Sequence, residues 1–180
     1  LDWAMQHNGP VAIRYPKALA EQQGGSRAAI ELGQAEVFTD GSDGLIIACG
    51  TLLGVSLAAA AQLREAGLEV GVINARFVKP LGTQLLFEKI EAAPWVVTVE
   101  ENVLSTGFGS AVLEAINEAR LSTGTIVRLG LPDRFVEHGE RGELLADLGL
   151  DAAGIALTCR RLAGRDPQPA DPVEPAAIHR

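Results

Sequence analysis

One repeated pattern constrains the fold of this chain more than any other feature of its sequence. From residue 45 onward, a continuous apolar run is followed by a turn marked by glycine or proline, and then by apolar residues at helical spacing. The apolar runs cover residues 45–50, 70–75, 95–99 and 125–129. Uninterrupted apolar strands are buried on both faces, and the helices between them make consecutive strands parallel. The sequence therefore predicts an α/β domain with a doubly wound, mostly parallel sheet.

Helices are expected between and after these strands, and a short additional strand is expected before them. Thr51 is the expected N-cap of the first helix, and Gly67 is its expected end. The other helices should cover residues 83–92, a segment that opens at Gly107 and Gly109 and runs through Ala119, and residues 140–148 and 152–162. The short strand should cover residues 35–38.

The composition of the chain changes along its length and predicts three parts. Residues 1–17 should form a helix end, a turn and an isolated strand at residues 11–15, before a polar, glycine-bearing stretch typical of a linker. The α/β domain should cover residues 31–163. Residues 164–180 are rich in proline and poor in large apolar residues, so we expect a disordered tail.

Charge and hydropathy exclude several classes of partner. The formal net charge of -8 and the sequence pI near 4.9 argue against binding to nucleic acid or to an anionic membrane surface. No apolar run is long enough for a membrane-spanning helix. Cys49 and Cys159 are far apart and fit neither a disulfide framework nor a zinc site. The chain starts without Met or a signal pattern, so we expect a soluble, cytoplasmic protein that begins within a longer one.

Few residues suggest catalysis. Gly107 and Gly109 suggest a dinucleotide-binding loop, but the motif would need a third glycine at Val112, so a tight turn is expected. Glu100 and Glu101 end a strand and point to opposite faces, so they cannot form a facing acid/base pair. Capping of backbone amides or a subunit contact is the expected role, and a surface or interface role is expected for His138. We predict no catalytic, cofactor-binding or metal-ligating residue.

Two cations near the N-terminus are the candidate binding residues. Arg14 and Lys17 flank Pro16 at the end of the isolated strand, in a chain that is otherwise acidic. Guanidinium and ammonium groups hold phosphate esters. A solvated strand end and a phosphate-binding site both remain open at this point.

Several stretches together resemble the 1-deoxy-D-xylulose-5-phosphate synthases, a family of the transketolase group. The matching stretches are residues 9–17, 75–81, 97–102, 129–133, 137–139 and 148–151, which occur in the order and spacing of that family. The resemblance covers nearly all of residues 1–163. It implies that residues 1–30 are the end of the middle, pyrimidine-binding domain with a linker, and that residues 31–163 are a domain like the C-terminal domain of transketolase.

The resemblance also implies an activity for the intact enzyme. Such synthases use thiamine diphosphate and Mg²⁺ to decarboxylate pyruvate and join the two-carbon fragment to glyceraldehyde 3-phosphate, in a step of isoprenoid, thiamine and pyridoxal biosynthesis. Their diphosphate motif and activating glutamate have no counterpart here. We therefore expect this chain alone to be inactive, to bind no cofactor, and to contribute fold and homodimer interface alongside the remainder of the synthase.

One family role and two alternatives complete the expectations. Family members carry arginine and glycine where this chain has Lys17 and Ala18, and that arginine holds the substrate phosphate, so Lys17 or Arg14 should bind it here. The first alternative is a beta subunit of a 2-oxoacid dehydrogenase, which shares the fold and differs at residues 76–81. The second is a free-standing, non-catalytic binding module.

Overall fold

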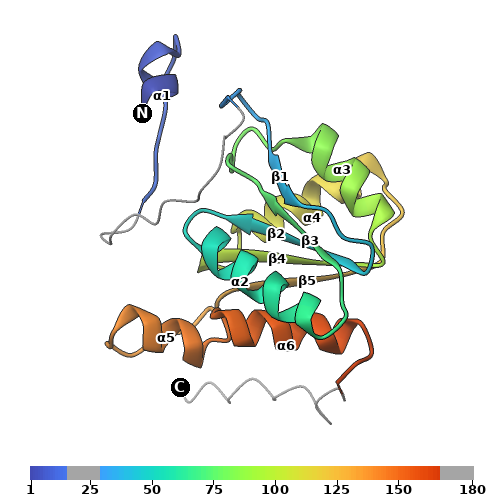
Figure 1. Ribbon diagram of the computed structural model, residues 1–180. Coiled ribbons are helices and arrows are strands. Elements are labelled where there is room, and N and C mark those ends of the chain that lie inside the picture. The colour runs from blue at the N-terminus through green and yellow to red at the C-terminus, as the bar shows by residue number, and fades with distance from the viewer. Residues whose placement is uncertain (16–28, 167–180) are drawn as a thin grey trace, which may run out of the picture.

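A single sheet organises the part of the chain that the computed structural model describes, which comprises residues 1–15 and 29–166 (Figure 1). Its strands are β1 (Glu36–Thr39), β2 (Gly44–Cys49), β3 (Val70–Asn74), β4 (Trp95–Val103) and β5 (Thr125–Leu131). Their order is β1-β3-β2-β4-β5, and only β1 runs antiparallel to its neighbour. The predicted α/β class with a mostly parallel sheet is confirmed.

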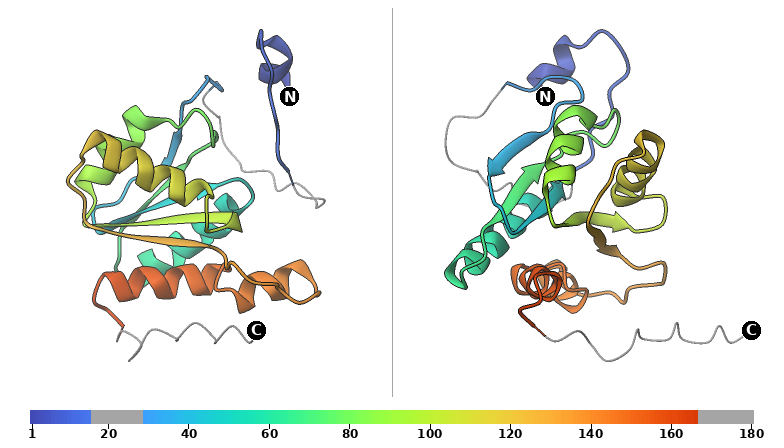
Figure 2. Two further views of the ribbon diagram at one scale, coloured as in Figure 1. Left: turned by 180° about the vertical axis from the view of Figure 1, so that it is seen from behind. Right: turned by 90° about the vertical axis from the view of Figure 1, so that its right-hand side faces the viewer.

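Helices cover both faces of the sheet (Figure 2). On one face lie α2 (Leu52–Glu65), α5 (Arg141–Asp147) and α6 (Ala152–Leu162), and on the other lie α3 (Thr83–Ala92) and α4 (Phe108–Ala119). Alternate residues of β2 pack against the helices on the two faces of the sheet, because successive strand residues point to opposite faces. Ile46 packs with the α2 and α6 side, and Ile47 packs with the α3 and α4 side.

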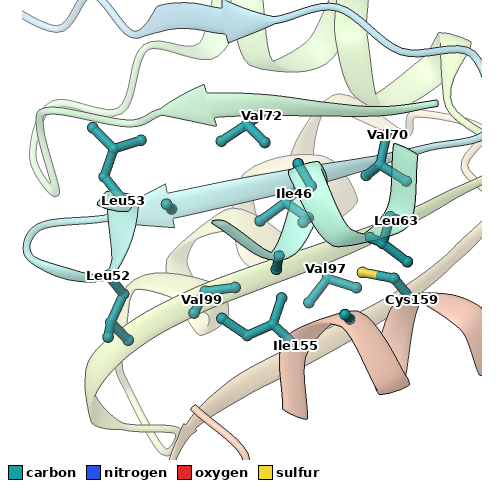
Figure 3. Packing of buried hydrophobic residues seen from close by; sticks show 14 of the residues in the cluster. Ile46, Leu52, Leu53, Leu63, Val70, Val72, Val97, Val99, Ile155 and Cys159 are labelled. Atoms are coloured by element: carbon teal, nitrogen blue, oxygen red, sulfur yellow. The ribbon is translucent and has the colours of Figure 1, made fainter. Parts of the chain in front are cut away.

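The larger core cluster lies between the sheet and the α2 and α6 pair (Figure 3). Ile46, Val97 and Val99 from the strands meet Leu63 of α2 and Ile155 of α6 there. Cys159 of α6 is also fully buried in this cluster, and its burial raises the pKa of the thiol to about 12. Cys159 therefore behaves as a small apolar residue of the core.

Most expected helix boundaries agree with the structure. α3 and α6 cover the residues expected from the sequence, and Gly67, with φ of 76°, follows the end of α2. Thr51 immediately precedes α2, but its side chain makes no capping hydrogen bond. Thr51 thus occupies the expected N-cap position, but its hydroxyl group donates to a different partner described below.

The strand expected at residues 11–15 is the main error. α1 (Asp2–Gln6) forms near the N-terminus, but residues 11–15 pair with no strand in the described parts of the chain. A strand needs a neighbour to satisfy its backbone groups, and the five described strands pair only with each other. The division into residues 1–30, 31–163 and 164–180 stays a prediction, since residues 16–28 and 167–180 lie outside the described residues.

Arg76 links the start of the domain to the loop after β3. Its guanidinium forms an ion pair with Glu36 of β1 at 2.8 Å, and both side chains are largely buried. It also donates to the backbone carbonyl of Ala29 at 3.1 Å. Arg76 has φ of 57°, a left-handed conformation that few non-glycine residues adopt. The residue therefore has a structural role in holding the segment that leads into β1.

Candidate functional site

The carboxyl ends of the parallel strands define the candidate site, because open α/β sheets bind their ligands at this edge. Four side chains meet there, and we call them the strand-end cluster: Arg14, Thr51, Glu101 and Arg141. They come from the N-terminal segment, the β2–α2 turn, β4 and the start of α5. The cluster thus joins segments that are far apart in the sequence.

Glu101 is the centre of the strand-end cluster. Its Oε1 accepts a hydrogen bond from Nε of Arg141 at 2.8 Å, and its Oε2 accepts one from a terminal guanidinium nitrogen of the same arginine. The hydroxyl group of Thr51 donates to Oε2 at 2.8 Å. The hydrogen bond from Arg141 holds the pKa of the Glu101 carboxyl below its ordinary value of 4.5, although partial burial opposes this shift. Glu101 is therefore an ionised acceptor near neutral pH.

Arg14 approaches the strand-end cluster from the N-terminal segment. One of its terminal nitrogens lies 3.5 Å from the backbone carbonyl oxygen of Glu101. At the other end of the same segment, the rings of Trp3 and Phe77 meet edge to face with centroids 5.3 Å apart. Lys17, the other expected phosphate-binding residue, lies outside the described residues, so its role stays a prediction together with that of Arg14.

Glu100 has a different environment from its neighbour. Its carboxylate is buried and accepts hydrogen bonds from the backbone N–H groups of Phe108 at 2.7 Å and Gly109 at 2.8 Å. These are the first amides of α4, which no intrahelical carbonyl can satisfy. Glu100 therefore caps α4 while Glu101 contacts α5, and the two carboxylates do not face each other. The expected capping of backbone amides is seen at Glu100.

The two glycines at the start of α4 are required by close packing. A Cβ atom at Gly107 would lie 2.4 Å from Oε2 of Glu100, and one at Gly109 would lie 2.6 Å from Oγ1 of Thr98. The amides that a phosphate would need are already bound by Glu100. The expected tight turn is present, and this helix start is not a phosphate loop.

Neither of the two remaining candidate groups, Cys49 and His138, is identified as a nucleophile. Burial raises the pKa of the Cys49 thiol at the end of β2 to about 11, with Glu100 also raising it and Arg14 opposing the shift. A thiol with such a pKa is protonated near neutral pH and reacts poorly. His138 is exposed in the loop between β5 and α5.

The described residues do not fit the diphosphate and metal site of a thiamine-dependent enzyme. Within residues 1–15 and 29–166, no three His, Cys, Asp or Glu side chains lie close enough together to hold a metal ion. The carboxylates at the strand ends are already bound to an arginine or to backbone amides. The expectation that this chain alone binds no cofactor stays a prediction. The helices within these described residues are all too short to span a lipid bilayer.

Sequence reasoning missed Thr51 and Arg141 as partners of Glu101. A weak signal was available for Arg141, which is the first residue of α5. The N-terminus of a helix carries partial positive charge and disfavours a cation. An arginine at that position therefore suggests a carboxylate nearby, but the sequence does not say which one.

The sheet order and the position of the strand-end cluster define a doubly wound α/β domain whose candidate site lies at the carboxyl edge of the sheet. The family model described as "Transketolase, C-terminal domain" matches residues 33–155. The chain belongs to the transketolase C-terminal domain family.

Similar curated proteins show which branch of the transketolase group this chain resembles. The chain is 46% identical over 163 residues to a 1-deoxy-D-xylulose-5-phosphate synthase of Rhodopirellula baltica, covering 91% of this chain and 26% of the relative. It is 44% identical over 168 residues to synthase 2 of Geobacter sulfurreducens, covering 92% of this chain and 27% of the relative. The resemblance to the synthase family is thus confirmed, and the chain spans about a quarter of the length of these curated relatives.

Solved structures agree on the fold. A solved structure described as "Split gene transketolase, inactive beta4 tetramer" matches with a TM-score of 0.70 and 30% identity. The match covers 76% of this chain and 44% of that one. A transketolase of Pichia stipitis matches with a TM-score of 0.50 and 18% identity, covering 73% of this chain and 18% of that one. The second match supports the fold alone.

Proposed function

We propose that this chain is the C-terminal part of a synthase that condenses pyruvate with glyceraldehyde 3-phosphate to 1-deoxy-D-xylulose 5-phosphate. The observation that carries this proposal is the identity of 46% over 163 residues with a synthase of that name. Residues 76–81 and 99–102, which distinguish the family, follow β3 and form the last part of β4. The intact enzyme would be a cytoplasmic transferase that supplies precursors for isoprenoid, thiamine and pyridoxal biosynthesis.

Within that enzyme, this chain contributes fold and interface. Thiamine diphosphate with Mg²⁺ would supply the carbanion chemistry of the intact enzyme, and its site would be built by the remainder of the protein. The described residues support this division, since Glu100 is used to cap a helix and Glu101 is paired with Arg141. A cofactor site needs its metal ligands and its activating carboxylate placed together.

An exposed apolar surface supports association with the remainder of the synthase and with a second copy. Within the described α/β domain, the exposed large apolar side chains lie at or near the carboxyl edge of the sheet: Ile30, Leu32, Val78, Val103 and Phe135. Phe135 is fully exposed in the loop after β5. Large apolar side chains that stay exposed along one edge of a domain favour burial against other protein. The split-gene relative is described as a tetramer, which agrees with association between copies of this chain.

Arg14 and Lys17 would hold the phosphate of glyceraldehyde 3-phosphate. Arg14 is exposed and adjoins the edge where ligands bind in this class of fold. A charge-assisted hydrogen bond contributes about 1.5–3 kcal/mol, so losing one should raise the Michaelis constant for the aldehyde roughly tenfold to a hundredfold. Lys17→Ala in the intact synthase should show this change with the pyruvate constant nearly unchanged. Lys17→Arg should match or improve on the parent enzyme.

Two measurements test the proposal as a whole. The gene region upstream of this chain, expressed together with it, should consume pyruvate in the presence of glyceraldehyde 3-phosphate, thiamine diphosphate and Mg²⁺. The isolated chain should show no micromolar binding of the cofactor by titration calorimetry. Tight binding by the isolated chain, or no turnover by the intact protein, would contradict the assignment.

A separate-chain arrangement is the second candidate. The similar solved structure is a split-gene transketolase described as an inactive beta4 tetramer, and this chain would by analogy be encoded separately from the rest of the enzyme. In that case the present chain would be a non-catalytic subunit. Copurification with a second polypeptide that carries the cofactor motifs would favour this arrangement over a single-chain enzyme.

A further inference from the structure

Two contacts attach the N-terminal segment to the carboxyl edge of the domain. The first is the ring contact between Trp3 and Phe77, in the loop after β3. The second is the approach of Arg14 to the backbone carbonyl of Glu101 on β4. Figure 1 shows this segment beside the end of the sheet where β2, β3 and β4 finish. The segment that carries the proposed phosphate-binding arginine therefore contacts the domain near both of its ends.

Glu101 is itself held firmly. Arg141 binds both of its carboxylate oxygens, a two-point geometry that fixes the orientation of the side chain. Thr51 adds a third bond at 2.8 Å, so the β2–α2 turn, β4 and α5 all contribute to the position of this residue. The side chain retains only 26% of its exposure. A backbone carbonyl on such a residue is a fixed acceptor.

The charges of the strand-end cluster favour the position of Arg14 near Glu101, the residue that Arg141 also binds. Two guanidinium groups that converge on one edge repel each other unless an anion lies between them. Glu101 supplies that anion, and the pKa of its carboxyl is lowered by both arginines. A long arginine side chain also loses conformational entropy when it is held in one place, so a fixed partner is needed.

We propose that Glu101 is a positioning residue that holds Arg14 at the carboxyl edge in the orientation needed to receive the substrate phosphate. This inference rests on the proposed function, because it assigns Arg14 to the phosphate of the aldehyde substrate. It adds a role for the C-terminal domain in substrate recognition that acts across the domain boundary. Glu101 touches no substrate in this account and acts only through Arg14.

The central test is Glu101→Gln in the intact synthase, which keeps the shape of the side chain and the backbone carbonyl but removes the charge. We expect the Michaelis constant for glyceraldehyde 3-phosphate to rise about twofold to fivefold, the size of effect typical of exposed charge pairs. The Michaelis constant for pyruvate should not change, because pyruvate carries no phosphate. A decrease in the aldehyde constant would mean that Glu101 only competes with phosphate for Arg14, and would overturn the inference.

A matched control comes from the opposite edge of the sheet. Glu69 precedes β3 and forms an exposed ion pair with Arg64 at 3.1 Å. Glu69→Gln therefore makes the same substitution in another Glu–Arg pair, far along the strands from Arg14. Its aldehyde and pyruvate constants should both equal those of the parent enzyme. If the aldehyde constant changed equally in Glu69→Gln and Glu101→Gln, the change would be explained by the loss of one negative charge. That result would contradict a positioning role for Glu101.

A double variant separates this inference from the phosphate assignment. If Glu101 acts through Arg14, then Arg14→Ala combined with Glu101→Gln should have the aldehyde constant of Arg14→Ala alone. Additive effects would overturn the positioning role while leaving Arg14 as a phosphate ligand. An unchanged aldehyde constant in Arg14→Ala itself would instead refute the phosphate assignment. Melting temperature and the pyruvate constant, measured on every variant, exclude general loss of structure as the cause.

Discussion

The carboxylate of Glu100 accepts the backbone N–H of Gly109 at 2.8 Å, so that the end of β4 is bonded directly to the first turn of α4. The second oxygen of the same carboxylate accepts from Phe108. A buried carboxylate at a helix N-terminus satisfies two amides and interacts favourably with the helix dipole. This contact joins a central strand to the helix that covers it.

Glu100→Ala should destabilise the domain more than any change at its exposed neighbours. Two buried amides would lose their acceptor, and a cost of about 2–4 kcal/mol in the free energy of unfolding is expected. Urea denaturation of the chain, followed by circular dichroism, measures this difference. Glu101→Ala is the matched control and should cost less than about 1 kcal/mol, because its ion pair is partly exposed. Equal costs at the two positions would contradict the capping role.

Gly109→Ala should also destabilise the chain. The added methyl group would lie 2.6 Å from Oγ1 of Thr98 and 3.0 Å from the side chain of Arg128, so the helix must shift away from the sheet. Overpacking of this kind costs about 1–3 kcal/mol. Gly142→Ala is the control, since a Cβ there meets nothing within 4 Å. That variant should be unchanged or stabilised by about 0.4–1 kcal/mol.

The stability contributed by Glu101 should depend on pH in the acid range. Its pKa in the folded chain lies below the ordinary value of 4.5, so its ion pair stabilises the fold above that pH. The contribution is lost as pH falls through the lowered folded-state pKa. Glu101→Gln should therefore reduce stability near neutral pH and show a weaker dependence below pH 4.5, as measured by thermal melts. Parallel pH profiles for the variant and the parent would disprove this.

Both cysteines should resist alkylation in the folded chain. The pKa of Cys49 is raised to about 11 and that of Cys159 to about 12, mainly by burial, so little thiolate exists at pH 8. Iodoacetamide with mass detection should label neither residue quickly until urea unfolds the protein. Cys49 should react before Cys159, because it is only partly buried. Rapid labelling of Cys159 in the native chain would show that the α6 contact opens readily.

The class of fold and most of its elements follow from local patterns in the sequence. Apolar runs such as residues 45–50 cannot be solvated, and only a sheet covered on both faces buries them fully. The expected bounds of α3 and α6 agree with the structure for a similar reason, since glycine, proline and helical spacing act locally. The synthase resemblance was also available from short local motifs.

The roles of the residues at the strand ends depend instead on contacts between segments far apart in the sequence. Glu100 and Glu101 are adjacent residues of the same type, but their side chains have different partners. Glu100 is buried and accepts hydrogen bonds from the first amides of α4, whereas Glu101 pairs with Arg141, which lies 40 residues further along the chain. Thr51 is a good helix cap by local rules, but a charged acceptor from β4 binds its hydroxyl group more strongly. Residues 11–15 have the composition of a strand but pair with none of the described strands, because strand formation depends on a partner that local sequence does not specify.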